Sequence, residues 1–136
     1  MSPSARSGRC RFILWLPVIV YMGVLFWLSS LHTVPGIPND PENRLAHFAA
    51  YAGLAMVTLR AFADGEWRGV TAAAAIGAVT IASLYGVSDE YHQHFVPGRT
   101  FDVFDMVADA LGAIGGASVV WVCSIMRRRS KTRHVL

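Results

Sequence analysis

Charged side chains are scarce in this sequence, and that scarcity excludes an ordinary soluble domain. Aspartate, glutamate, lysine and arginine together make up 15% of the 136 residues, whereas typical soluble domains contain about a quarter. Hydrophobic residues make up 54%. A soluble chain of this length needs a polar surface around its core, and this chain lacks the side chains for one. We therefore expect the surrounding medium to be lipid.

Cysteine is also scarce, and this excludes several kinds of site. Only Cys10 and Cys123 occur, without a CxxC pair or any spacing typical of cysteine-based metal ligands,. We expect two unpaired thiols. An evident catalytic nucleophile is lacking too, since Ser88 and Thr100 show no accompanying His/Asp relay pattern,.

Four long apolar runs dominate the remaining sequence, at residues 12–31, 45–63, 69–87 and 101–126. A proline-rich loop at 32–43, a tight turn at 64–68 and a polar segment at 89–100 separate them,. At about 1.5 Å per residue, each run can cross a hydrocarbon core of about 30 Å. The pattern predicts an all-α membrane protein. Its four-helix transmembrane bundle occupies 12–126, between basic tails at 1–11 and 127–136.

The basic residues predict the orientation of this bundle. Two of the twelve, Arg44 and Arg99, lie at the two loops predicted on the other side, and Arg60 and Arg68 lie beside the central turn. The other eight flank the first and last runs: Arg6, Arg9, Arg11, Arg127, Arg128, Arg129, Lys131 and Arg133. Short basic patches beside apolar runs mark the cytoplasmic side. We therefore expect a multi-pass protein of the bacterial cytoplasmic (inner) membrane, with both termini cytoplasmic and no nucleic-acid partner.

With this topology, polar residues from three segments converge at the outer face. At 100° per residue, the three aspartates of the last run lie within about 80° of arc with Gly112 and Gly116, a small-xxx-small pair typical of helix packing in lipid. These aspartates should therefore point into the bundle. The predicted site comprises Arg44, His47 and Tyr51 on the second helix, Asp89, Glu90, Gln93 and His94 at the end of the third, Arg99 in the loop, and Asp102, Asp105 and Asp109 on the fourth.

Three interpretations of this constellation stay open. An ionised carboxylate at membrane depth costs several kcal/mol unless it is paired or hydrated, so such residues are functional candidates. They could form a pocket for an anionic lipid or cell-wall precursor, with arginine contacting a phosphate or carboxylate. They could belong to a membrane enzyme for a lipid-linked substrate, with Mg²⁺, Mn²⁺ or Zn²⁺ as a divalent cation. They could also form a polar clasp between helices. Oligomeric state is not predicted.

Residues 88–116 carry a family resemblance. They read SDEYHQHFVPGRTFDVFDMVADALGAIGG, which resembles the signature of the VanZ-like family of bacterial membrane proteins: E-x-x-Q, then P-G-R, D-x-x-D, N, G and G. The matching residues are Glu90, Gln93, Pro97, Gly98, Arg99, Asp102, Asp105, Gly112 and Gly116, preceded on the second helix by Arg44, His47 and Tyr51. The resemblance extends over about residues 11–126.

The resemblance implies a membrane protein of the cell envelope. One member of the family is linked to glycopeptide (teicoplanin) resistance, and the family implies no particular reaction. This chain differs from the family pattern at Asp109, where asparagine is usual. A carboxyl group at that depth must be protonated or paired, whereas an amide could form hydrogen bonds without charge.

Overall fold

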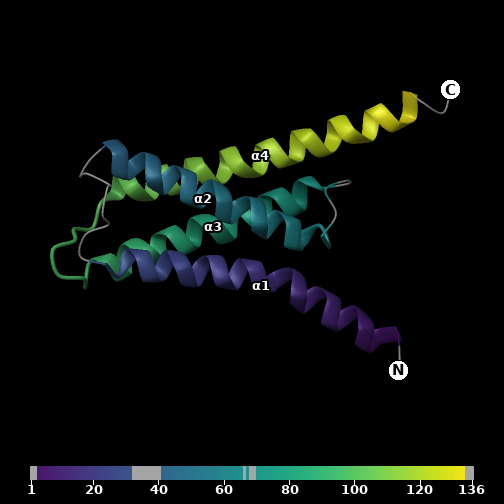
Figure 1. Cartoon of the computed structure of the whole chain (residues 1–136). Coiled ribbons are helices and arrows are strands. Elements are labelled where there is room, and N and C mark those ends of the chain that lie inside the picture. The colour runs from purple at the N-terminus through teal and green to yellow at the C-terminus, as the bar shows by residue number, and fades with distance from the viewer. Residues whose placement is uncertain (1–2, 32–40, 66, 68–69, 134–136) are drawn as a thin grey trace.

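The computed structural model describes residues 3–31, 41–65, 67 and 70–133. Four helices run alternately up and down in one bundle: α1 (Pro3–Ser29), α2 (Pro41–Phe62), α3 (Ala72–Gln93) and α4 (Val103–Arg133). The described residues contain no strand. The all-α, four-helix prediction is therefore confirmed, and Figure 1 shows both chain ends at the same end of the bundle.

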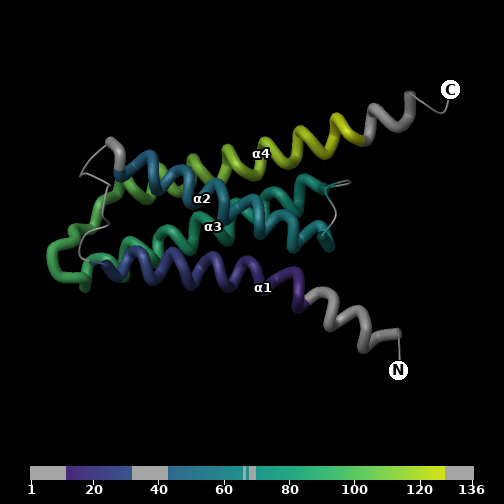
Figure 2. Tube along the Cα trace, in the orientation of Figure 1, coloured from purple at the N-terminus to yellow at the C-terminus, as the bar shows by residue number. Residues whose placement is uncertain are grey.

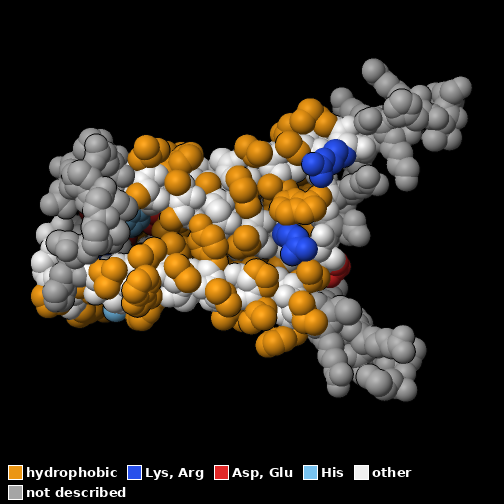
Figure 3. All heavy atoms as spheres, in the orientation of Figure 1, with side chains coloured by type: hydrophobic (Ala, Val, Ile, Leu, Met, Phe, Trp, Pro, Cys, Tyr) orange, Lys and Arg blue, Asp and Glu red, His pale blue; other side chains and the backbone are white. Residues whose placement is uncertain are grey.

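Each helix is long and apolar enough to cross a membrane. The apolar windows are Phe12–Ser29, Asn43–Phe62, Ala72–Gln93 and Val103–Arg127. Hydrophobic side chains spread over the sides of the bundle, and the basic side chains coloured on this face lie towards the end near the termini (Figure 3). A surface of this kind suits lipid, where every helix satisfies its own backbone hydrogen bonds.

Several helix ends differ from the sequence prediction. α2 begins at Pro41, so residues 41–43 are helical and not part of the predicted loop; proline suits a first helical position because it needs no donor there. α3 continues beyond the predicted run to Gln93. α4 begins only after Asp102, whose carboxylate accepts a hydrogen bond from the Phe104 amide at 2.8 Å and caps the helix,.

The predicted loop, turn and basic tails agree only in part with the structure. The remainder of the predicted first loop, residues 32–40, lies outside the described residues. In the predicted turn, Asp64 and Gly65 have φ values of 51° and 82°, the left-handed conformation of a tight turn,. α1 and α4 extend into the segments predicted as basic tails, from Pro3 and to Arg133.

The closest helix contact joins α2 and α4. A Cβ atom added at Gly112 would overlap the Phe48 carbonyl, and one added at Gly116 would overlap the Ala52 carbonyl. The small-xxx-small pair therefore lets α4 lie directly against the backbone of α2. This contact brings the polar positions of the two helices within hydrogen-bonding reach, one to two turns further along.

α1 lies beside α2 and α3 and is held largely by side chains that donate to backbone carbonyls. The Tyr21 hydroxyl donates to the Ala50 carbonyl at 2.9 Å, and the Tyr85 hydroxyl donates to the Met22 carbonyl at 2.6 Å. The buried apolar core lies between the helices and includes Val18, Leu25, Leu54, Ala55, Leu59, Ala78, Ala82, Ala113 and Ala117.

Gly112→Ala should destabilise the bundle by about 1–3 kcal/mol, the usual cost of overpacking, because the added methyl group has only backbone to displace. Gly115→Ala is the matched control, since its Cβ would lie 3.4 Å from the flexible end of Phe48. Thermal unfolding in detergent measures both variants. Equal stability of the two would contradict the close α2–α4 contact.

Candidate functional site

The polar residues gather at the end of the bundle away from the termini, where α3 ends and α2 and α4 begin. Figure 2 shows the three chain segments meeting there, with the α3–α4 connection at the outside.

Asp109 is the deepest carboxylate and is fully buried. Its Oδ1 lies 2.9 Å from Nδ1 of His47, so the carboxylate is paired with an imidazole of α2. Gly86 of α3 makes room for it, since a Cβ there would lie 2.9 Å from Cβ of Asp109. The carboxyl that the sequence placed at this depth therefore has a specific partner.

Asp105 lies one turn nearer the membrane surface and contacts three residues of α2. Its Oδ2 accepts a hydrogen bond from Asn43 Nδ2 at 2.8 Å and lies 3.8 Å from Nε2 of His47. Arg44 Nε lies 4.0 Å from its Oδ1. Asp105 is thus anchored to α2 while remaining buried.

Arg44 is the counter-charge at the rim. Its Nη2 lies 3.4 Å from Asp102 Oδ2, and its guanidinium lies over the Phe104 ring, 5.0 Å from the centroid. The side chain is 40% exposed, so this ion pair contributes little to stability, at most about 1 kcal/mol. Its main effect is to neutralise the charge of the Asp102 carboxylate.

Glu90 is the buried carboxylate of α3, with no exposed surface. Its Oε2 accepts a hydrogen bond from the Asp102 backbone amide at 3.0 Å, which ties the end of α3 to the start of α4. Its Oε1 is buried without a hydrogen-bond partner. Next to it, Gln93 donates to Asp89 Oδ2 at 3.2 Å within the same helix.

Arg99 comes from the α3–α4 loop and lines the main polar cavity. This cavity of about 320 Å³ is lined by Asn43, Gln93, Gly98, Arg99, Thr100, Asp102 and Asp105. Nε of Arg99 is buried without a hydrogen-bond partner. The predicted site groups this arginine with the carboxylates of the fourth helix. It shares the cavity with Asp102 and Asp105, but the arginine that forms ion pairs with these two residues is Arg44.

The remaining predicted residues divide into two groups. Tyr51 and Asp89 are buried and line a smaller cavity of about 70 Å³ together with His47 and Arg99. The Tyr51 ring lies parallel to that of His47, with centroids 6.3 Å apart. His94 is exposed and packs edge-on against Phe95, outside the cluster. The structure therefore brings together ten of the eleven predicted residues; their role remains a prediction.

Two polar residues of this region were missed in the sequence. Asn43 anchors Asp105 and lines both cavities. It lies four residues, about one helical turn, before His47. Proline is favoured at the first position of a helix, so Pro41 was the signal that Asn43 belongs to the same helix as His47. His92 lies 3.0 Å from the Ser30 hydroxyl and stacks on Phe26, which ties α3 to α1; nothing in its sequence position signals this contact.

Asp109→Asn should have a free energy of unfolding within about 1 kcal/mol of the wild-type value, because the amide oxygen can still accept a hydrogen bond from His47. Asp109→Ala removes that acceptor and leaves the buried imidazole unpaired, so we expect a loss of about 1–3 kcal/mol. Thermal unfolding in detergent separates the two. Equal losses in both variants would show that charge, and not the hydrogen bond, matters at this position.

Comparison with known proteins assigns this architecture to a family. The family model VanZ/LLP1 matches residues 15–126, a range that contains most of the apolar part of α1, all of α2 and α3, most of α4, and the whole polar cluster. No curated protein and no solved structure gives a significant match. The chain is therefore a multi-pass membrane protein that belongs to the VanZ/LLP1 family.

Proposed function

We propose that this protein binds an anionic headgroup, the phosphate or carboxylate of a lipid or cell-wall precursor, in the polar cavity at the outer face of the cytoplasmic membrane. The observation that carries the proposal is Arg99, which lines this cavity and whose Nε is buried without a hydrogen-bond partner. A guanidinium can contact a phosphate or carboxylate through two parallel hydrogen bonds.

The other residues of the cavity support binding of an anion beside Arg99. Asn43, Gln93 and Thr100 contribute neutral groups that can donate hydrogen bonds,. Asp102 and Asp105 also line the cavity, but Arg44 and Asn43 already contact their carboxylates. These contacts partly neutralise the two carboxylates and so reduce their repulsion of an anion bound beside Arg99.

An apolar groove adjoining the cavity supports an amphiphile over a free anion. The smaller cavity shares Asn43, Gln93 and Arg99 with the polar cavity, and it shares Leu25 and Leu28 with a groove between α1 and α2. This groove has a volume of about 400 Å³ and is lined by Pro17, Val20, Tyr21, Val24, Leu25, Leu28 and Val57. A headgroup at Arg99 could therefore continue into an acyl chain along α1. The family membership supports a role in the cell envelope, and glycopeptide resistance is one such role.

The proposal requires the cavity to face outwards. Reporter fusions after Met126 should read cytoplasmic and fusions near Gly36 external, because the basic patches lie beside the chain ends,. An external C-terminus would place the cavity on the cytoplasmic side and contradict the outer-face proposal.

Arg99→Lys should keep the thermal stability of wild type and lose bound amphiphile. Lysine retains the charge but not the two-pronged hydrogen bonding, and losing one charge-assisted hydrogen bond weakens binding by about tenfold or more. Native mass spectrometry of protein extracted with its lipids measures retention. Arg60→Lys, on the last turn of α2, is the matched control and should retain ligand.

Two outcomes would decide against this function. If Arg99→Lys and Arg99→Ala both retain the wild-type ligand, the cavity does not bind through Arg99. If both variants fail to fold, the arginine serves to hold the carboxylate-rich helices together, as the clasp interpretation requires, because removing one partner from buried charges is strongly destabilising.

A further inference from the structure

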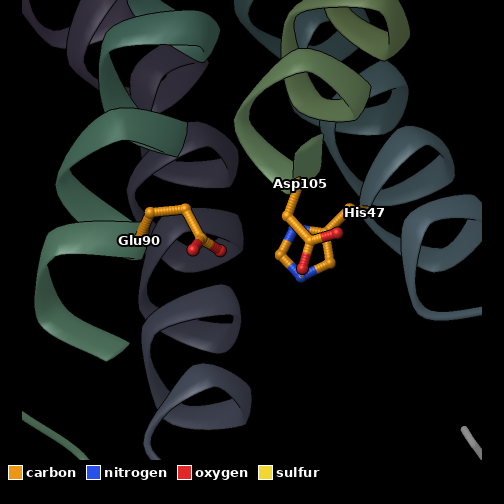
Figure 4. A group of neighbouring side chains, drawn as sticks. All are labelled: His47, Glu90 and Asp105. Carbon is orange, nitrogen blue, oxygen red and sulfur yellow. Dashed lines mark ion pairs between the residues drawn. The ribbon is translucent and has the colours of Figure 1, made fainter. Parts of the chain in front are cut away.

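We propose that His47, Glu90 and Asp105 form a binding site for a divalent cation. One ligand atom from each residue, an imidazole nitrogen or a carboxylate oxygen, lies within 4.8 Å of the other two. The residues come from α2, α3 and α4, and Figure 4 shows the Glu90 carboxylate directed across the gap towards the other two side chains. This proposal does not depend on the binding of an amphiphile.

Each carboxylate has one oxygen in a hydrogen bond and one oxygen without a hydrogen bond, although Arg44 Nε lies 4.0 Å from the second oxygen of Asp105. Oε2 of Glu90 accepts from the Asp102 amide, and Oδ2 of Asp105 accepts from Asn43. The other oxygens, Glu90 Oε1 and Asp105 Oδ1, are buried without a hydrogen-bond partner. Buried acceptors of this kind are rare in proteins. The fully buried Glu90, with one carboxylate oxygen unpartnered beside His47 and Asp105, is the second and independent reason to infer a ligand here.

His47 is oriented as a metal ligand. Its Nδ1 lies 2.9 Å from Asp109 Oδ1. With Asp109 ionised, its carboxylate can only accept, so Nδ1 donates this hydrogen bond and a neutral imidazole has its lone pair on Nε2. That nitrogen lies 3.8 Å from Asp105. Metal-binding histidines commonly donate their second ring N–H to a carboxylate, which fixes the ring and raises its basicity. Asp109 would serve here as this positioning residue.

The ligand set indicates the class of ion. One imidazole with two carboxylates suits Zn²⁺ or Mn²⁺ better than Ca²⁺, which prefers oxygen ligands alone. The two carboxylates carry the charge that a divalent ion neutralises. Asp105 also lines the polar cavity, so water or a ligand oxygen from that cavity could complete the coordination, as in zinc sites with three protein ligands.

Metal binding by the full-length protein tests the proposal with the ion alone. Protein carrying a tag without histidine is stripped with a chelator in detergent, loaded with Zn²⁺ or Mn²⁺, dialysed and analysed for metal. We expect about one ion per wild-type chain. Glu90→Gln should weaken binding at least tenfold while still accepting from the Asp102 amide. Asp109→Asn should weaken it by about 10–100-fold, as is usual for lost outer-shell partners.

Two controls separate this site from other causes. His94→Ala removes an exposed histidine at the same end of the bundle and should bind metal as wild type does. Arg99→Lys should also bind metal normally, so a failed amphiphile assay and a failed metal assay can be told apart. Size-exclusion chromatography and circular dichroism show which variants remain folded.

Wild-type protein alone provides a test that needs no variant. Bound Mn²⁺ should show an imidazole nitrogen coupling in pulsed electron paramagnetic resonance. Absence of bound metal in wild type, absence of that coupling, or equal binding by folded Glu90→Gln would each overturn the proposal.

Discussion

The close approach of α4 to the backbone of α2 is the contact on which the polar end of this protein depends. Gly112 and Gly116 lie directly against the backbone at Phe48 and Ala52. On the same helix faces, nearer the membrane surface, Asp109 meets His47 and Asp105 meets Asn43. A wider helix separation would leave these carboxylates buried without partners, which is costly at membrane depth. The pairing of the polar residues therefore depends on the close packing of the small residues.

Much of this arrangement could be predicted from the sequence. Hydropathy determines four helices because a membrane allows few alternatives to a spanning helix. The spacing of Asp105 and Asp109 places both on the face shared with Gly112, and both are buried as expected. Asp102 differs, because it precedes α4 and its side chain is 32% exposed. Helical periodicity gives the direction of a side chain around its own axis without any knowledge of its neighbours.

Which side chains pair across the helices could not be predicted in the same way, because the pairing depends on the rotation and depth of each helix relative to the next. The predicted site includes Arg99 beside the aspartates, yet the arginine that pairs with Asp102 and Asp105 is Arg44. His94 was grouped with the cluster by its position at the end of the third helix, but its side chain is exposed. Asn43 was assigned to a loop, although α2 already includes it.

The contact between Gly86 and Asp109 links residue identities on two different helices. Because a Cβ at position 86 would lie 2.9 Å from that of Asp109, any side chain at 86 competes for the volume that the carboxyl occupies. The two positions therefore form a size-coupled pair. A larger residue at 86 would require a smaller one at 109, so the pairing of Asp109 with the imidazole of α2 depends on the glycine of α3.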